Sequence, residues 1–346
     1  MTSTLGRLVT VSAVVVLTTS GLGGCGLLDG SSRIQEALEY LPDDATSVVF
    51  VDEAAIAERL EVDDLETGAS EDDINRWIEA SKEEAYGSEL RNWTAVMQDA
   101  AFSEFDVEWE ATATSEDDLV RVTKLHADVD FEAIADDLED AGYERSKKGD
   151  AETFTADLSS ADATTGLIGG RYPSVLLNVA LVPDEHLIVT GDIAEGLDVV
   201  GEDKDSLADS GRFDDVLDQA PSQDDLEFAT MAFDPPCGAA LGGRVTPEQA
   251  EQALGNLGHP RNIGYFAAAD ERLKVVRLFR DEEAATDDEN GLVTHLDGPA
   301  KAAGLDVELD TEVDGSTVVV EADFDDRQPI TQAWTRGEGP FACSPA

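Results

Sequence analysis

The chain is poor in positive charge: 346 residues carry 23 Lys and Arg against 76 Asp and Glu, a formal charge of −53. A surface this acidic repels phosphate backbones, which excludes nucleic acid as a partner. Cysteine is also scarce, and three in this length exclude a small disulfide-stapled scaffold. Apolar residues make up 42% of the sequence, which is enough to build a core, so the chain is expected to fold.

Catalytic motifs are absent from the sequence as well. It contains no G-x-S-x-G elbow, P-loop, H-E-x-x-H or C-x-x-C. The four histidines are far apart and form no helical ligand pair: His126, His186, His259 and His295. We therefore expect no enzyme activity, no cofactor and no metal site. A hydrolase whose site is assembled only by folding stays open as an alternative.

What is present begins at the N-terminus. Arg7 is the only charged residue before Asp29, and it precedes a mostly apolar run of ten residues, Leu8–Leu17. That length is typical of the apolar region of a signal peptide, whereas a membrane-spanning helix needs about 20 residues. The run is followed by small residues and then by Leu22-Gly23-Gly24-Cys25.

These four residues resemble the lipobox of prokaryotic lipoproteins, although Gly23 departs from the usual Ala, Ser or Thr. The resemblance implies a signal peptide over residues 1–24, cleaved before Cys25. Cys25 would carry a diacylglyceryl group and an acyl chain such as palmitate, with residues 25–36 as anchor and tether. It places the protein at the cell membrane, facing the extracytoplasmic side. The alternative is a secreted protein cleaved nearby.

With Cys25 lipidated, Cys237 and Cys343 remain, an even number in an oxidising compartment. We expect a disulfide between them that pins a C-terminal tail, residues 336–346, to the body. Two buried free thiols or an intermolecular pair are the alternatives.

The mature chain shows signs of an internal duplication. Leu41-Pro42 and Ala220-Pro221 each precede a short apolar run, and a hairpin pattern follows later in each half, over residues 179–190 and 265–276. We expect two related halves, 37–205 and 206–335, with chance similarity between ordinary hairpins as the alternative.

Helix and strand signals alternate along both halves. Asp130 can cap a helix with Phe131, Ile134 and Leu138 on one face, ended by Gly142. Ser70 opens another that holds Ile74, Trp77 and Ile78, and the alternation over Leu119–Leu125 indicates a strand. Most predicted strands alternate apolar and polar residues, so that one face is apolar and the other polar. This pattern favours an α+β fold with mostly antiparallel sheets and helices packed on one face.

One stretch matches a calcium-binding loop: Asp310, Glu312, Asp314 and Glu321 stand at ligand positions 1, 3, 5 and 12, and Gly315 stands at position 6, where the loop turns. Its flanks are alternating, β-rich runs, and Asp-Gly between such runs predicts a hairpin. We therefore expect a hairpin and no dedicated metal site, with an adventitious cation site on its edge as the alternative.

The mature part also resembles uncharacterised envelope lipoproteins of high-GC Gram-positive bacteria. The likeness lies in Leu41-Pro42-Asp43-Asp44 and in Asp205-Ser206-Leu207-Ala208-Asp209, and it implies no activity. We expect non-enzymatic binding of an envelope protein or a wall polymer. A divalent-cation-responsive acidic module and an extracellular hydrolase are the alternatives. The acids are spread along the whole chain, as in proteins of salt-adapted organisms.

Overall fold

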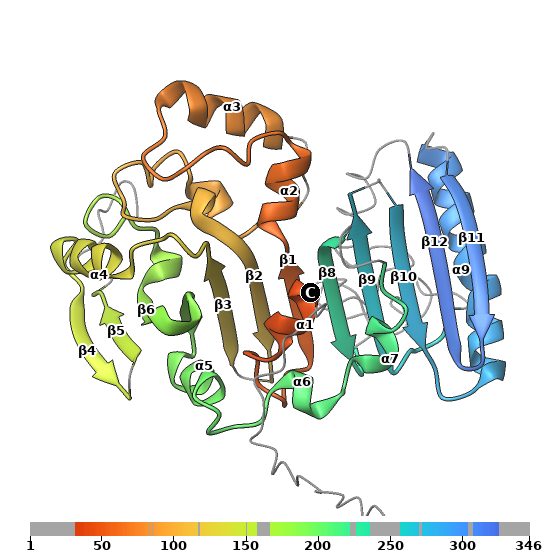
Figure 1. Cartoon of the computed structure of the whole chain (residues 1–346). Helices are drawn as coiled ribbons and strands as arrows, with labels where there is room; N and C mark the ends of the chain where they lie inside the picture. The colour runs from red at the N-terminus through yellow and green to blue at the C-terminus, as the bar shows by residue number, and fades with distance from the viewer. Residues whose placement is uncertain are drawn as a thin grey trace, which may run out of the picture. The chain divides into compact units, whose positions relative to one another are not determined.

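The secondary structure combines helices with antiparallel strands (Figure 1). The computed structural model describes residues 32–82, 84, 86–116, 118–149, 151–157, 167–221, 226–235, 257–269, 272–303 and 307–324, which belong to one compact unit. The helices are α1 (Arg33–Leu38), α2 (Glu53–Arg59), α3 (Glu71–Ser81), α4 (Phe131–Asp140), α5 (Ile193–Val200), α6 (Leu207–Ser210), α7 (Asp214–Leu217) and α9 (Glu282–Ala303). Short 3-10 helices are η1 (Arg91–Trp93), η2 (Glu104–Asp106), η4 (Ser174–Leu176) and η5 (Pro183–Glu185).

Among the described residues, twelve strands form a single sheet in the order β11-β12-β10-β9-β8-β1-β2-β3-β7-β6-β5-β4. The strands are β1 (Ser47–Val51), β2 (Val107–Thr114), β3 (Leu119–Leu125), β4 (Glu144–Lys148), β5 (Ala151–Thr155), β6 (Asn178–Val182), β7 (Leu187–Gly191), β8 (Leu226–Phe233), β9 (Asn262–Ala268), β10 (Arg272–Leu278), β11 (Val307–Asp314) and β12 (Thr317–Phe324). Every neighbouring pair is antiparallel. The predicted α+β class with antiparallel pairing is confirmed.

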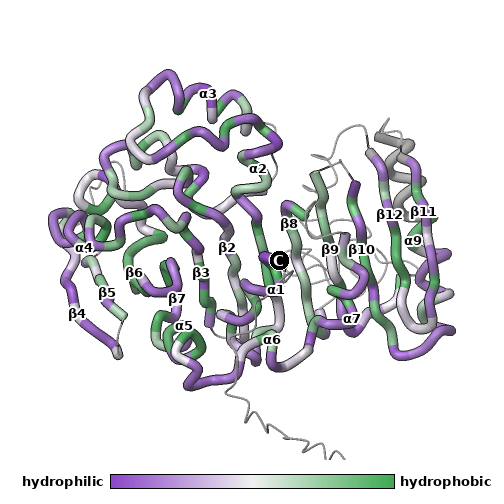
Figure 2. Tube along the Cα trace, in the orientation of Figure 1, coloured by the Kyte–Doolittle hydropathy of each residue, from purple (hydrophilic) through white to green (hydrophobic). Residues whose placement is uncertain are grey.

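Helices cover both faces of this sheet, which differs from the prediction of one covered face. On the face of Val48 and Phe50, the core includes residues of α1, α5, α6 and α7. On the opposite face, α4 packs over the strands of the first half and α9 over those of the second. The reason lies in β8 and β9, which are largely apolar (Figure 2). Residues on both faces of these two strands are buried, so both faces need a cover.

The strand order repeats on either side of the central β1–β8 pair. Outward from β8 run β9, β10 and then the β12–β11 hairpin; outward from β1 run β2, β3 and, beyond two more strands, the β5–β4 hairpin. In both directions a helix, α9 or α4, separates the third strand from the last hairpin along the chain. This repetition favours two related halves, while the boundaries at residues 205 and 335 stay predictions.

The repetition corrects one of the two sequence matches. The run that follows Pro42 and the run that follows Pro221 become β1 and β8, which are equivalent in the repeated order. The hairpin equivalent to β9–β10 is β2–β3, however, and the predicted match, β6–β7, is an additional hairpin between β3 and β5. Its resemblance to β9–β10 came from turn chemistry that ordinary hairpins share.

The capping signals place the helices as predicted. Asp130 accepts hydrogen bonds from the backbone of Glu132 and Ala133 at the start of α4, and Gly142 follows its end with φ of +97°. Ser70 caps α3. Ile78 of α3 is the exception, because it is 46% exposed while Ile74 and Trp77 are buried. The buried face of α3 therefore contains Ile74 and Trp77 but not Ile78, which the sequence pattern had included.

The stretch that matches a calcium loop is the β11–β12 hairpin. Asp314 pairs with Thr317, so Gly315 and Ser316 form a two-residue turn, and Gly315 has φ of +57°. Asp310 lies opposite Glu321, and the Glu321 carboxylate pairs with Lys274 at 3.0 Å. The prediction of a hairpin is confirmed.

We expect Gly315→Ala to lower the free energy of unfolding by about 1 kcal/mol, because an L-residue in the left-handed region costs about 1–2 kcal/mol. A Cβ at Gly315 would meet nothing within 4 Å, so the cost is conformational alone. Urea unfolding measures it. Gly315→Asn, which tolerates this region better, should lose less; an equal loss for both variants would contradict the explanation.

Candidate functional site

The three cysteines with predicted roles lie outside the described residues. Cys25 precedes Ser32, Cys237 lies within 236–256, and Cys343 lies within 325–346. The lipidation and the Cys237–Cys343 disulfide therefore stay predictions. Where their side chains are described, the histidines lie on separate elements: His126 follows β3, His186 stacks edge-on against Phe131, and His259 borders another cavity.

The residues with the most perturbed chemistry are two glutamates at helix starts. Glu53 is the first residue of α2, after the cap Asp52, and Glu104 is the first residue of η2, after the cap Ser103. Both side chains are buried, at 2% and 3% exposure. Two carboxyl groups this deep in the protein need hydrogen-bond partners or protons.

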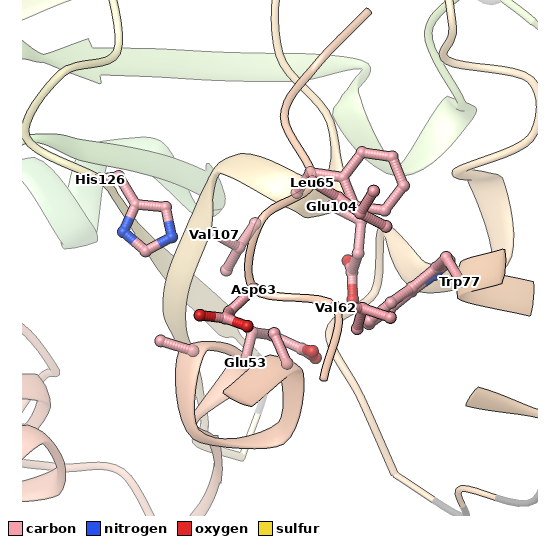
Figure 3. A pocket seen from close by; sticks show the side chains of 11 residues that line it. Glu53, Val62, Asp63, Leu65, Trp77, Glu104, Val107 and His126 are labelled. Atoms are coloured by element: carbon pink, nitrogen blue, oxygen red, sulfur yellow. The ribbon is translucent and has the colours of Figure 1, made fainter. Parts of the chain in front are cut away.

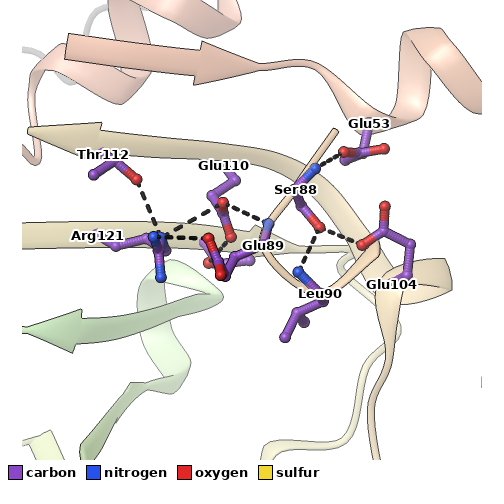
Figure 4. A network of polar contacts seen from close by, with 9 residues as sticks. Glu53, Ser88, Glu89, Leu90, Glu104, Glu110, Thr112 and Arg121 are labelled. Carbon is purple, nitrogen blue, oxygen red and sulfur yellow. Dashed lines mark hydrogen bonds and ion pairs between the residues drawn. The ribbon is translucent and has the colours of Figure 1, made fainter. Parts of the chain in front are cut away.

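Ser88 binds both carboxyl groups (Figure 4). Its backbone N–H donates to Glu53 Oε1, and its hydroxyl donates to Glu104 Oε2. The hydroxyl in turn accepts from the Leu90 backbone N–H at 3.2 Å. One loop residue therefore holds the first residue of α2 and the first residue of η2 together.

The other oxygen of each carboxyl, Glu53 Oε2 and Glu104 Oε1, receives no N–H or O–H from any described residue. The two side chains lie within hydrogen-bonding reach of each other. Two bare carboxylates would repel, whereas a single proton between them satisfies both free oxygens. Burial raises the pKa of Glu53 to about 7, against the opposing effect of a hydrogen bond from Glu104, and burial with the Glu53 charge raises the pKa of Glu104 well above its usual range.

A third buried glutamate, Glu110 on β2, has a hydrogen-bond donor at each of its two carboxylate oxygens. It accepts from the Glu89 backbone at 3.0 Å and from the Thr123 hydroxyl at 3.2 Å, and Arg121 lies 3.6 Å away (Figure 4). Burial raises the pKa of Glu110 and the Arg121 charge opposes the shift. The contrast isolates Glu53 and Glu104 as the pair with unused oxygens.

The loop that carries Ser88 is fixed from several sides. Glu227 on β8 accepts from Tyr86 at 2.8 Å and pairs with Arg59 of α2, which also reaches Glu84 at 2.9 Å. Arg91 donates to the Ser81 carbonyl at 2.7 Å. These contacts hold Ser88 in place beside the carboxyl pair.

The carboxyl pair borders a cavity of about 80 Å³ between α2, α3 and η2 (Figure 3). Its walls are largely apolar and include Val62, Leu65 and Trp77. Asp63, which is exposed, and His126, which is half-buried, also line it. Small-molecule sites usually enclose about 300–1,000 Å³. This cavity fits only a few water-sized groups.

No sequence pattern pointed to this site. With 76 acidic residues, carboxylates occur at every spacing, and Glu53 and Glu104 meet only because β1 and β2 are neighbours in the sheet. A usable hint was an acid directly after a capping residue, which places a carboxyl at a helix N-terminus. Within the described residues no group of three or more His, Cys, Asp or Glu could hold a metal ion. Likewise, no described helix combines the length and apolarity that crossing a membrane requires.

Comparison with known proteins returns little. Neither a known protein family nor a curated protein matches this chain. Two solved structures, crystal forms I and III of TP0453, are similar at 9% and 8% identity, each with a TM-score of 0.42. The two alignments cover 86% and 85% of this chain, respectively, and each covers 96% of the TP0453 chain. A likeness at this level does not indicate a function.

Proposed function

We propose that this protein is a lipid-anchored envelope protein, attached through Cys25 on the extracytoplasmic side, that binds a protein or a wall polymer without catalysing a reaction. The observation that carries the proposal is the run Leu8–Leu17 followed by Leu22-Gly23-Gly24-Cys25. The start of α1 supports it. Ser32 forms a capping box with Gln35, so the part of the chain that the structure describes begins with a capped helix seven residues after Cys25, and cleavage before Cys25 would leave it whole.

The anchor restricts where partners can be met. Residues 26–31 span at most about 20 Å when fully extended. The body is joined to them through α1, which is fixed by Arg33: its guanidinium lies 2.8 Å from Asp52 and 3.2 Å from Glu108. The protein therefore works close to the membrane surface, where a small adaptor or wall-binding protein would act.

The cavity beside the carboxyl pair, at about 80 Å³, lies far below the roughly 300–1,000 Å³ of a usual substrate site, which favours binding over catalysis there. The charge of −53 favours cationic partners, because complementary potentials speed association and like charges suppress it.

Replacing Cys25 by serine tests the anchor. We expect the full chain to fractionate with membranes and to incorporate labelled palmitate, and the Cys25→Ser variant to lose the label completely and leave the membrane in an alkaline wash. A single acyl chain already gives measurable binding and two give stable anchoring, so the loss should be nearly total. Cys237→Ser is the matched control and should stay labelled. Retention of Cys25→Ser in washed membranes would contradict the proposal.

A further inference from the structure

We propose that the cavity between α2, α3 and η2 binds a primary alkylammonium group, whose N–H donors replace the proton between Glu53 and Glu104. The proposal goes beyond the envelope role and does not depend on the anchor. It starts from two buried carboxylate oxygens without a donor at the end of a cavity with apolar walls.

The chemistry of the two oxygens selects the ligand head. Glu53 Oε2 and Glu104 Oε1 can only accept, and an ammonium group offers three donors and one positive charge. A bare divalent ion fits less well, because no third His, Cys, Asp or Glu in the described chain completes a ligand set. Ser88 already fills the other oxygen of each carboxyl, so the pair presents one acceptor from each side.

The walls select the group attached to the ammonium head. Val62, Leu65 and Trp77 are buried, and their apolar surface suits methylene groups. A volume of about 80 Å³ holds the head with a short aliphatic stem, as at the end of a lysine side chain. A quaternary ammonium is excluded on two grounds: it has no N–H donor, and it is bulkier at the nitrogen.

The entrance favours a cation. The lining includes exposed Asp63 and half-buried Ala54, Ala57 and His126, through which a cation can approach the buried carboxyls of Glu53 and Glu104. A carboxylate at the mouth raises the local concentration of cations. In Figure 3 the Glu53 and Glu104 side chains converge, whereas His126 stands apart from them.

Proton balance gives the pH dependence. Above pH 7 the unliganded pair holds one proton, because the pKa of Glu53 is about 7 and that of Glu104 lies well above its usual range. The ammonium takes the place of that proton, which passes to solvent, so one proton is released for each amine bound; below pH 7, where Glu53 is protonated too, a second proton is released. Affinity should therefore rise with pH until the pair is free of its proton. Charged groups facing the pair enter this balance: Arg91 from η1, Glu110 from β2, Asp63 from the loop after α2, and His126 after β3.

Calorimetric titration of the purified full chain in detergent with n-butylammonium chloride tests the proposal. We expect saturable binding, at least tenfold tighter at pH 8 than at pH 6, and release of close to one proton at pH 8, measured in two buffers of different ionisation enthalpy. Tetramethylammonium chloride at the same ionic strength should show no saturable heat. Equal binding of the two cations, or no proton release, would overturn the proposal.

Variants locate the site. Glu53→Gln and Glu104→Gln should each lose at least tenfold in affinity, whereas Glu58→Gln, exposed on the same helix, should bind as the parent does. Should a glutamine variant fail to fold, Ala57→Leu fills the cavity without touching the carboxyls and should also abolish binding. Unchanged binding by Ala57→Leu would overturn the assignment. Cys25→Ser should bind normally, which separates this proposal from the anchor.

Two further ligands distinguish whether the amine comes from a protein or from a wall polymer. Nα-acetyl-lysine amide, with a free side-chain ammonium, represents a lysine in a protein. A wall peptide that contains a diamino acid represents the polymer. The tighter of the two identifies the source. Binding of neither, where butylammonium binds, would restrict the site to small free amines.

Discussion

Replacing Asp288 by alanine is expected to lower the free energy of unfolding by about 3–5 kcal/mol, because it removes one partner of a fully buried ion pair. Arg277 on β10 and Asp288 on α9 are both fully buried. They form a two-bond pair, with Nε to Oδ2 at 2.8 Å and Nη2 to Oδ1 at 2.9 Å. Gly258 completes it, since its N–H donates to Asp288 at 2.8 Å and its carbonyl accepts from Arg277 at 3.0 Å.

Urea unfolding of the variant and two controls measures this effect. Asp64→Ala breaks an exposed pair with Arg76 and should cost no more than about 1 kcal/mol. The double variant Arg277→Met with Asp288→Leu removes both charges and should recover much of the loss. A loss for Asp288→Ala no larger than that for Asp64→Ala would show that the pair does not hold α9 against the sheet.

The second large effect is in the pH dependence of stability. The folded-state pKa values of Glu53 and Glu104 are raised by burial, to about 7 for Glu53, so the folded protein binds a proton that the unfolded chain has lost. The Glu53 contribution is fully present below the ordinary glutamate pKa of about 4.3 and is lost as pH rises through about 7, whereas the Glu104 contribution is retained to higher pH. The slope is about 1.4 kcal/mol per pH unit for each such proton.

Glu104→Gln should remove most of this slope. Its amide can donate to Glu53 in place of the shared proton and still accept from Ser88, so the variant should resemble the parent at pH 5 and be more stable at pH 8. Urea unfolding at a series of pH values, with Glu58→Gln as the exposed control, gives the comparison. A parent and a Glu104→Gln variant with parallel pH profiles would show that the pair holds no proton.

Local features were predictable from sequence because they are decided by neighbours in the chain. The caps of α3 and α4, the strand over Leu119–Leu125 and the turn at Gly315 all depend on residues a few positions apart. The carboxyl pair depends instead on the β1–β2 pairing, which brings residue 53 beside residue 104. No local pattern encodes that juxtaposition.

Placement of the helices on the sheet was the part predicted wrongly. The sequence shows that a strand such as β9 is largely apolar, but not which helix covers each side. That depends on strand order, and the order depends on the long-range pairing of β1 with β8. The match between the β6–β7 and β9–β10 hairpins was wrong for the same reason. The turn of a hairpin depends on neighbouring residues, whereas its position in the sheet depends on long-range pairing.

The central pairing also governs when this protein can finish folding. Ser47 pairs with Ala232, so β1 lacks one of its two neighbours until β8 is available. A chain exported as we propose, N-terminus first, emerges with β1 and β2 long before β8, and closing so long a loop is slow and exposes apolar strands meanwhile. The acidic residues along the intervening chain would keep that waiting intermediate soluble, which gives the charge a role during secretion as well as after it.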